Sequence, residues 1–192
     1  MPLARPAPRT PFHIRNVECR GFRRADGLWD IEGHLTDVKS YDFINSWRGE
    51  LVAGTPVHDM WLRLTVDVNF LIHAVEAVTD ASPYRICGNI TPNYQRLVGL
   101  TIGPGFTKKA RAVLGGVQGC THLLELLGPM ATTCYQTVTR PTYIEEGIPA
   151  DGGDDTRKRR TMVNTCHALA SDSEVIQKFW PDLYTGNDKK LP

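Results

Sequence analysis

Apolar and polar positions alternate along much of the first 80 residues, which is the period of a β-strand. Residues 12–24 and 28–38 flank the tripeptide Ala25-Asp26-Gly27, and an Asp-Gly pair supplies the positive φ angles of a tight hairpin turn. After a turn-rich segment, the alternation resumes over residues 60–66. Residues 70–79 follow a short connection and are rich in β-branched and small apolar side chains. The pattern therefore predicts two antiparallel hairpins.

Beyond residue 83, apolar side chains recur every three or four positions, which is the helical period. Residues 107–114 are typical of a short helix that ends at Gly115-Gly116, and a longer helix begins after Gly119. Pro129 lies inside the longer helix. Because proline has no backbone N–H and its ring clashes with the preceding turn, we expect Pro129 to kink or divide this helix.

The last part of the chain alternates between irregular and helical patterns. Residues 139–160 contain two prolines, three glycines and many acidic side chains, a composition that predicts a mobile loop. The sequence Ser171-Asp172-Ser173-Glu174 predicts a helix cap, followed by a short helix that ends near Trp180. Strands first and helices afterwards indicate the α+β class, with an N-terminal antiparallel sheet packed against C-terminal helices. We expect one domain over residues 1–192, with a flexible N-terminus over residues 1–11.

Composition narrows the class of protein. The 192 residues carry a formal net charge of +1, and this length can bury an apolar core without disulfides. No leader-like or membrane-spanning apolar stretch is present, so we expect a cytoplasmic protein with reduced thiols. Near-neutral charge argues against nucleic-acid binding. We expect a small-molecule substrate and no membrane partner. The sequence is compatible with a monomer or with a homo-oligomer. The five cysteines are odd in number and show no CxxC spacing: Cys19, Cys87, Cys120, Cys134 and Cys166.

Cys120 stands just after a glycine at the start of the longer predicted helix. The positive end of the helix dipole favours the thiolate, the form that attacks electrophiles and binds metals. His122 and Glu125 follow at three-residue spacing, so the carboxylate could orient the imidazole. The alternative is that Cys120 is a small buried apolar residue and His122 an ordinary surface residue.

Two other groups of polar residues are candidates. His58 and Asp59 precede a predicted strand after a proline turn, which offers a ligand beside an acid or a plain strand end. Asp30, Glu32 and His34 share one face of the second predicted strand, opposite an apolar face that holds Trp29, Ile31 and Leu35. If helices cover the polar face, its groups could share a proton in acid–base chemistry; otherwise it is a solvated sheet face.

Four stretches together resemble the domain-of-unknown-function 2889 family of bacterial proteins: CRGFRRADGLWDIEGHLTD, HDMWLRLTVD, GCTHLLELLGPMATT and CHAL. The resemblance covers almost the whole chain. It implies a single cytoplasmic bacterial domain. The association of some members with bacteria that degrade aromatic compounds implies an aromatic catabolic intermediate as substrate.

The order of elements is also distantly similar to NifU-like iron–sulfur scaffold proteins. Those proteins carry a cysteine before a strand, a second after the next strand and a third on a later helix. By this resemblance His58 takes the place of the first cysteine, and Cys87 and Cys120 correspond to the others. The resemblance thus implies a Cys-Cys-His set that suits zinc or iron with an open coordination position.

These observations lead to three hypotheses. The first is a small-molecule enzyme with lyase or hydrolase chemistry, in which His58, Cys87 and Cys120 hold zinc or iron and Asp59 or His122 transfers a proton. The second is a carrier or scaffold for metal or iron–sulfur clusters. The third is a cofactor-free acid–base lyase. No glycine-rich phosphate loop is present, so we expect no nucleotide cofactor.

Overall fold

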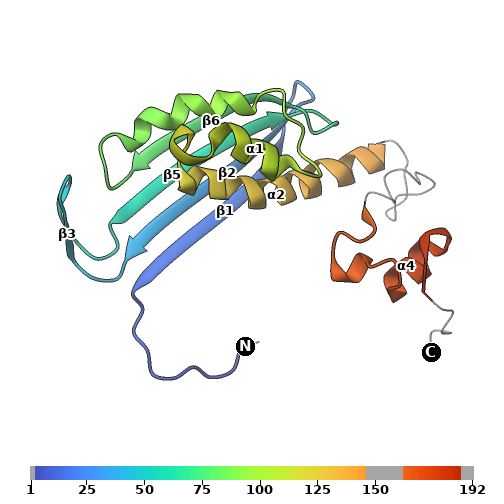
Figure 1. The fold of residues 1–192 in the computed structure, drawn as a ribbon, viewed down its shortest axis with the longest axis horizontal. Helices are drawn as coiled ribbons and strands as arrows, with labels where there is room; N and C mark the ends of the chain where they lie inside the picture. Colours follow the sequence, from blue (N-terminus) through green and yellow to red (C-terminus); the bar gives the residue numbers. More distant parts are fainter. Residues whose placement is uncertain (1–2, 146–161, 187–192) are drawn as a thin grey trace. The chain divides into compact units, whose positions relative to one another are not determined.

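A four-stranded antiparallel sheet forms one layer of the computed structural model, which describes residues 3–145 and 162–186 (Figure 1). The strands follow one another in space in the order β1-β2-β5-β6. Both predicted hairpins are confirmed, and Gly27 in the first turn has a φ angle of 84°. The strand bounds are β1 His13–Arg23, β2 Trp29–Lys39, β5 Pro56–Val66 and β6 Ile72–Ala81.

The segment between β2 and β5 forms a small hairpin of its own. Strands β3 (Phe43–Asn45) and β4 (Gly49–Leu51) pair with each other and not with the main sheet. Each has only three residues, which is too short for the alternation to be recognised in the sequence. The predicted turn-rich segment is therefore partly strand.

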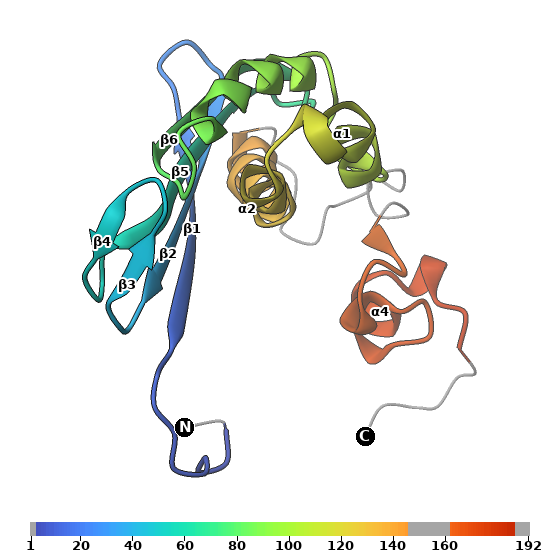
Figure 2. The same cartoon turned by 60° about the vertical axis from the view of Figure 1, so that its left-hand side comes forward.

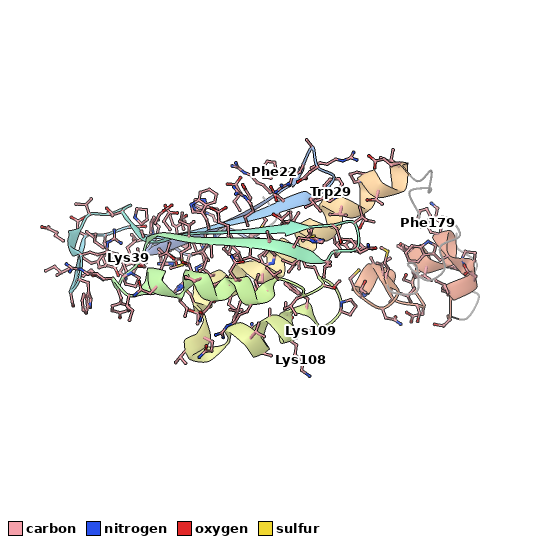
Figure 3. All side chains as sticks on the ribbon, turned by 90° about the horizontal axis from the view of Figure 1, so that it is seen from above. Phe22, Trp29, Lys39, Lys108, Lys109 and Phe179 are labelled. Atoms are coloured by element: carbon pink, nitrogen blue, oxygen red, sulfur yellow. The ribbon has the colours of Figure 1, made fainter. Side chains whose placement is uncertain are left out.

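Helical segments cover one face of the sheet, as Figure 2 shows for α1 and α2. The 3₁₀-helical segment η1 (Cys87–Leu97) lies along β6, and it leads into α1 (Phe106–Leu114), η2 (Gly116–Gln118) and α2 (Thr121–Glu145). Lys108 and Lys109 of α1 point away from the sheet (Figure 3). Sheet and helices together confirm the predicted α+β class. Within residues 3–145 and 162–186, no helix combines the length and apolar character needed to cross a membrane.

The core lies between the sheet and α2. Alternate residues of the central strands are buried, and they meet the apolar side of α2. Burial of one leucine-sized side chain contributes about 1.5–3 kcal/mol, so this layer is the main source of stability. The fully buried side chains at this interface include Ile31, Leu35, Met60, Leu62, Leu64, Leu123, Leu126, Leu127 and Met130.

Helix α2 is one continuous element from Thr121 to Glu145, so the expectation that Pro129 divides it is wrong. Proline removes one backbone hydrogen bond, but burial of Met130, Cys134 and Val138 beyond it holds the helix together. The helix also includes residues 139–145, which had been assigned to a mobile loop. Residues 146–160 of that predicted loop lie outside the described residues.

The chain divides into two compact units after Val138, and the prediction of one domain over residues 1–192 stays a prediction. In the second unit, α4 (Glu174–Phe179) is capped by Ser173, whose Oγ accepts a hydrogen bond from the N–H of Ile176 at 3.2 Å. The predicted cap is therefore confirmed. The unit also contains the short segments η3 (His167–Leu169) and η4 (Pro181–Leu183).

Substitution of Gly21 by alanine should destabilise the fold. A methyl group at Gly21 would overlap the side chain of Thr137, so α2 would have to move away from β1. We expect a loss of about 1–3 kcal/mol of unfolding free energy in urea denaturation. Gly88→Ala is the matched control, because nothing lies within 4 Å of its added methyl group. Equal stability of the two variants would contradict the close approach of α2 to β1.

Candidate metal centre

A buried carboxylate, Asp37, lies near the end of β2 on the face that the helices cover. It occupies the next position on the buried face of that strand, which otherwise carries mainly apolar side chains, and only 1% of its surface is exposed. In the register of the sheet, Asp37 lies opposite Arg15 of β1 and His58 of β5. Since cross-strand partners project to the same face, the three polar side chains meet there.

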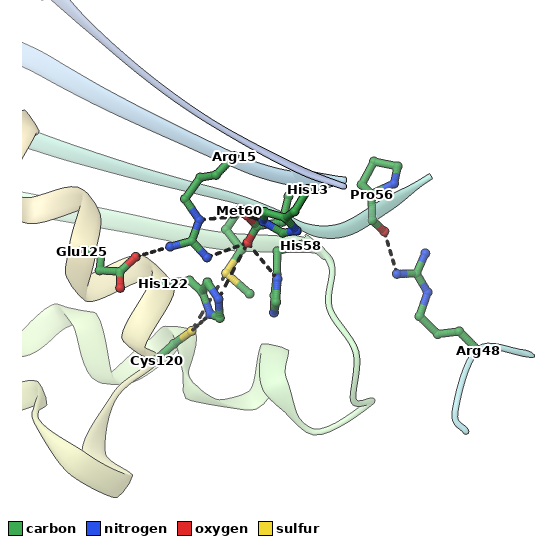
Figure 4. Close-up of polar contacts among 10 residues, drawn as sticks. His13, Arg15, Arg48, Pro56, His58, Met60, Cys120, His122 and Glu125 are labelled. Atoms are coloured by element: carbon green, nitrogen blue, oxygen red, sulfur yellow. Dashed lines mark hydrogen bonds and ion pairs between the residues drawn. The ribbon is translucent and has the colours of Figure 1, made fainter. Parts of the chain in front are cut away.

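Every acceptor position of the Asp37 carboxylate is used. Figure 4 labels its three donors, His13, Arg15 and His58. Oδ1 accepts hydrogen bonds from Nε2 of His13 at 2.9 Å and Nε of Arg15 at 2.8 Å. Oδ2 accepts from Nη2 of Arg15 at 2.8 Å and Nδ1 of His58 at 3.0 Å. Burial alone would raise the pKa of Asp37, but the hydrogen bonds from Arg15 and His13 outweigh it and lower the pKa to about 2. The group is therefore a carboxylate at neutral pH.

A second imidazole reaches the carboxylate from α2. Nε2 of His122 lies 3.8 Å from Oδ2 of Asp37, and its ring stacks on the ring of His58 with centroids 3.8 Å apart. Burial lowers the pKa of both histidines, and the electrostatic effects of His122 on His58 and of Arg15 on His122 act in the same direction. Both imidazoles are therefore neutral at pH 7, the form in which a ring nitrogen can bind a metal.

Two polar contacts fix the start of α2, and with it His122. Nη1 of Arg15 binds the carboxylate of Glu125, so the same guanidinium bridges Asp37 and α2. The hydroxyl of buried Tyr94 donates to the carbonyl of Cys120 at 3.0 Å and accepts from its N–H at 3.2 Å. Burial raises the pKa of Tyr94, so the hydroxyl stays protonated and can keep both bonds.

Three potential metal-binding atoms lie close together. One atom each from Asp37, His58 and His122 lies within 4.8 Å of the other two. Within the described part of the chain, no other three His, Cys, Asp or Glu side chains come so close. Around a tetrahedral ion with bonds of about 2.0–2.1 Å, ligand atoms lie roughly 3.3 Å apart. The distances of 3.0 and 3.8 Å from Oδ2 of Asp37 fall on either side of that value.

The hydrogen bonding around Asp37 is compatible with an ion. A metal between Asp37 and His58 would replace the proton that Nδ1 of His58 donates to Oδ2. Oδ2 would then keep two partners, the ion and Arg15, so the buried carboxylate would stay fully satisfied. Sγ of Cys120 lies 3.9 Å from Nδ1 of His122, where it can accept that N–H and leave Nε2 directed at Asp37.

A family model described as "Protein of unknown function (DUF2889)" matches residues 13–136. The chain belongs to the DUF2889 family. The predicted resemblance to this family is confirmed, and the matched range contains Asp37 and all of its hydrogen-bond partners. Searches of the curated proteins and of the solved structures gave no match. The resemblance of this DUF2889 chain to NifU-like scaffold proteins is therefore not supported.

The structure brings together only part of the ligand set that the sequence predicted. His58 belongs to the group around Asp37. Cys120 is next to this group, because its Sγ lies 3.9 Å from Nδ1 of His122. Cys87 begins η1 and is not a member of the group. His122, predicted to transfer protons, is also a potential ligand. Glu125, predicted to orient His122, binds Arg15.

Asp59 lies on the opposite face of the sheet from His58, because neighbouring residues of a strand project to opposite faces. Nε2 of His34 bonds Asp59 at 2.7 Å, and the imidazole stacks on Trp61 with centroids 3.6 Å apart. Asp30 accepts from Thr65, and Glu32 pairs with Arg63.

The hollow on this second face is small. It has room for about one water molecule and therefore cannot enclose a substrate. Asp30, Glu32 and His34 thus share a face, as predicted, and no helix within residues 3–138 covers that face. The hollow is lined by Glu18, Arg20, Glu32, His34 and Trp61.

Three residues of the site were missed in the sequence: Asp37, Arg15 and His13. One signal was present, because Asp37 continues the series Trp29, Ile31 and Leu35 on the apolar face of β2. A charged residue at such a position needs partners, and Arg15 is the residue opposite it in the hairpin register.

Substitution of Asp37 by asparagine should make the unfolding free energy fall less steeply in acid than it does in the wild type. The pKa of folded Asp37 is about 2, below the ordinary value of 3.8, so its contribution is complete above about pH 4 and lost as the pH falls through about 2. The wild type should lose about 2 kcal/mol of unfolding free energy there that Asp37→Asn does not lose. Urea denaturation between about pH 5 and 1.5 measures the difference.

The exposed Asp80 provides the control for this measurement. Asp80→Asn should follow the wild-type acid profile. A profile for Asp37→Asn that also follows the wild type would contradict the role of Asp37 as a buried, hydrogen-bonded carboxylate.

Proposed function

We propose that this protein is a small-molecule enzyme with a single divalent metal ion, zinc or iron, bound by Asp37, His58 and His122. The observation that carries the proposal is the convergence of three ligand atoms from β2, β5 and α2 beside one buried carboxylate. The ligand set differs from the one expected from the sequence, since Asp37 and His122 take the places of Cys87 and Cys120.

Two imidazole nitrogens and one carboxylate oxygen form a ligand set that suits zinc or iron(II) and leaves coordination positions open. A metal bound there would supply Lewis acidity, which polarises a carbonyl or hydroxyl and supports hydrolase or lyase chemistry. The side chains of His58 and His122 are 14% and 23% exposed, so a small molecule can reach them from solvent. Arg15 and His13 hold Asp37 and therefore position the ligands.

An aromatic catabolic intermediate is the proposed substrate class. Besides the association of some family members with bacteria that degrade aromatic compounds, support comes from a ring cluster beside His13. Phe12 and Tyr41 have ring centroids 4.6 Å apart, and Nζ of Lys39 lies 5.0 Å from the centroids of both Tyr41 and Phe43. Lys39 is the cross-strand partner of His13. The cluster offers apolar surface and a positive charge at the strand ends that carry the site.

A cofactor-free acid–base enzyme is the second candidate, because Asp37 and His58 also fit that chemistry. The 3.0 Å bond fixes the proton of His58 on Nδ1, and the lowered pKa keeps Nε2 available as a base. This version uses Asp37 and His58 instead of Asp30, Glu32 and His34. An iron–sulfur carrier draws less support, because the group around Asp37 contains no thiolate.

Calorimetric titration with Zn²⁺ should show one site per chain in metal-free wild-type protein. His58→Gln and His122→Gln each remove one ligand, so the dissociation constant should rise by about 100-fold or more. His34→Gln is the matched control, since His34 also pairs with an aspartate on β5 but on the other face of the sheet. Wild-type affinity in His58→Gln, or equal losses in all three variants, would refute the assignment.

Substitution of Cys87 by serine should leave Zn²⁺ affinity unchanged. Cys87 lies outside the group of ligand atoms, whereas the Cys-Cys-His set predicted from the sequence includes it. The same titration distinguishes the two ligand sets. A marked loss of affinity in Cys87→Ser would favour the sequence-based set over Asp37, His58 and His122.

The acid–base candidate is tested by metal removal. Once a substrate is found, protein dialysed against a chelator should be inactive and should recover on addition of Zn²⁺ or Fe²⁺. Full activity after metal removal would select the cofactor-free mechanism.

A further inference from the structure

The two edges of the main sheet differ in how they are protected. Beside β6, Nε2 of Gln95 in η1 donates to the carbonyl of Val75, and the backbone of Ile72 bonds to Gly99 and Leu100. At the other edge, β1 pairs with β2 alone (Figure 1). All eleven residues of β1 pair without a bulge, and none is a proline. An edge of this kind is a template for another strand.

Half of the backbone groups of β1 face away from the sheet. Backbone hydrogen bonds join Ser40 to Phe12 at one end of the hairpin and Arg24 to Leu28 at the other, so even-numbered residues of this strand bond to β2. Bonding sides alternate along an antiparallel strand. The N–H and C=O groups of the odd-numbered residues within 13–23 therefore point outward, toward the position of a further strand.

Three apolar side chains of β1 are also exposed. Ile14, Val17 and Phe22 are 45%, 46% and 44% exposed. Proteins usually protect an edge with proline, a bulge or a covering segment, and within residues 3–138 none of these lies along the outer edge of β1. An additional strand would bury apolar surface on both faces of β1.

We propose that a second copy of this chain pairs its β1 antiparallel to β1 across a two-fold axis, which joins two sheets into one of eight strands. A two-fold axis requires the strand to be complementary to itself. Charge provides this complementarity, because Glu18 and Arg20 lie on the same face of β1, two residues apart, and bond each other at 2.8 Å.

One register aligns the outward backbone groups and sets Glu18 opposite Arg20. Outward-facing odd residues must pair with odd residues, and Cys19 opposite the partner's Cys19 meets this condition. Glu18 then lies opposite the partner's Arg20, and Arg20 opposite the partner's Glu18. The same register places Arg15 opposite the partner's Arg23, but the Arg15 guanidinium is already bonded to the carboxylates of Asp37 and Glu125. The overlap of residues 15–23 forms roughly ten main-chain hydrogen bonds. In the neighbouring register, Glu18 would lie opposite the partner's Glu18, which is unfavourable.

The dimer does not depend on the metal site, although β1 also carries His13 and Arg15. Light scattering coupled to gel filtration should give twice the chain mass of 21.4 kDa for wild-type protein. Val17→Pro removes an outward N–H that β2 does not use, a change that an edge strand tolerates. Gel filtration should show this variant as a monomer, and circular dichroism should show that it is folded. Val17→Thr, which keeps the N–H and the branched side chain, should remain a dimer.

Charge reversal tests the register. Glu18→Arg and Arg20→Glu each create two like-charge pairs across the axis, so each should raise the dimer dissociation constant about ten-fold. The double variant restores opposite charges at both pairs between positions 18 and 20 and should recover wild-type dimerisation. A monomeric wild type, a dimeric Val17→Pro variant, or a double variant that dimerises no better than the single variants would overturn the proposal.

Discussion

The burial of one carboxylate, Asp37, constrains the arrangement around the site. A buried charge is tolerated only when it is paired and hydrogen-bonded, and Asp37 meets this requirement with donors from β1 and β5. The same Arg15 that binds Asp37 also binds Glu125 of α2, so the position of the helix over the sheet is tied to the carboxylate. His122 reaches Asp37 because α2 starts where Arg15 and Tyr94 hold it.

The sequence predicted the fold better than the site. Strand alternation and the Asp-Gly turn identified both hairpins, and helical spacing identified α1 and α2, because these are local patterns. His58 and His122 were recognised as polar residues beside strand and helix starts. Their partner Asp37 was missed, since its role depends on cross-strand register and on α2, which are tertiary features. Cys87 was included through a resemblance that relied on element order alone, without distances between side chains.

Each face of the sheet carries one aspartate–histidine pair. Asp37 and His58 lie opposite each other on the face covered by α2, whereas Asp59 and His34 form a similar pair on the other face, which no helix within residues 3–138 covers. Only the first pair gains a third potential ligand, because only that face meets a helix that carries His122. Its carboxylate also has an arginine fork, which keeps it ionised when buried. The difference between the faces therefore comes from packing and not from residue type.

Anomalous diffraction from crystals grown with Zn²⁺, measured on both sides of the zinc absorption edge, tests the central claim most directly. The account predicts one strong peak per chain, with bonds of about 2.0–2.2 Å to an Asp37 oxygen and to one nitrogen each of His58 and His122. A peak bonded to Cys87 or to His34, or no peak at the Asp37 carboxylate, would contradict it.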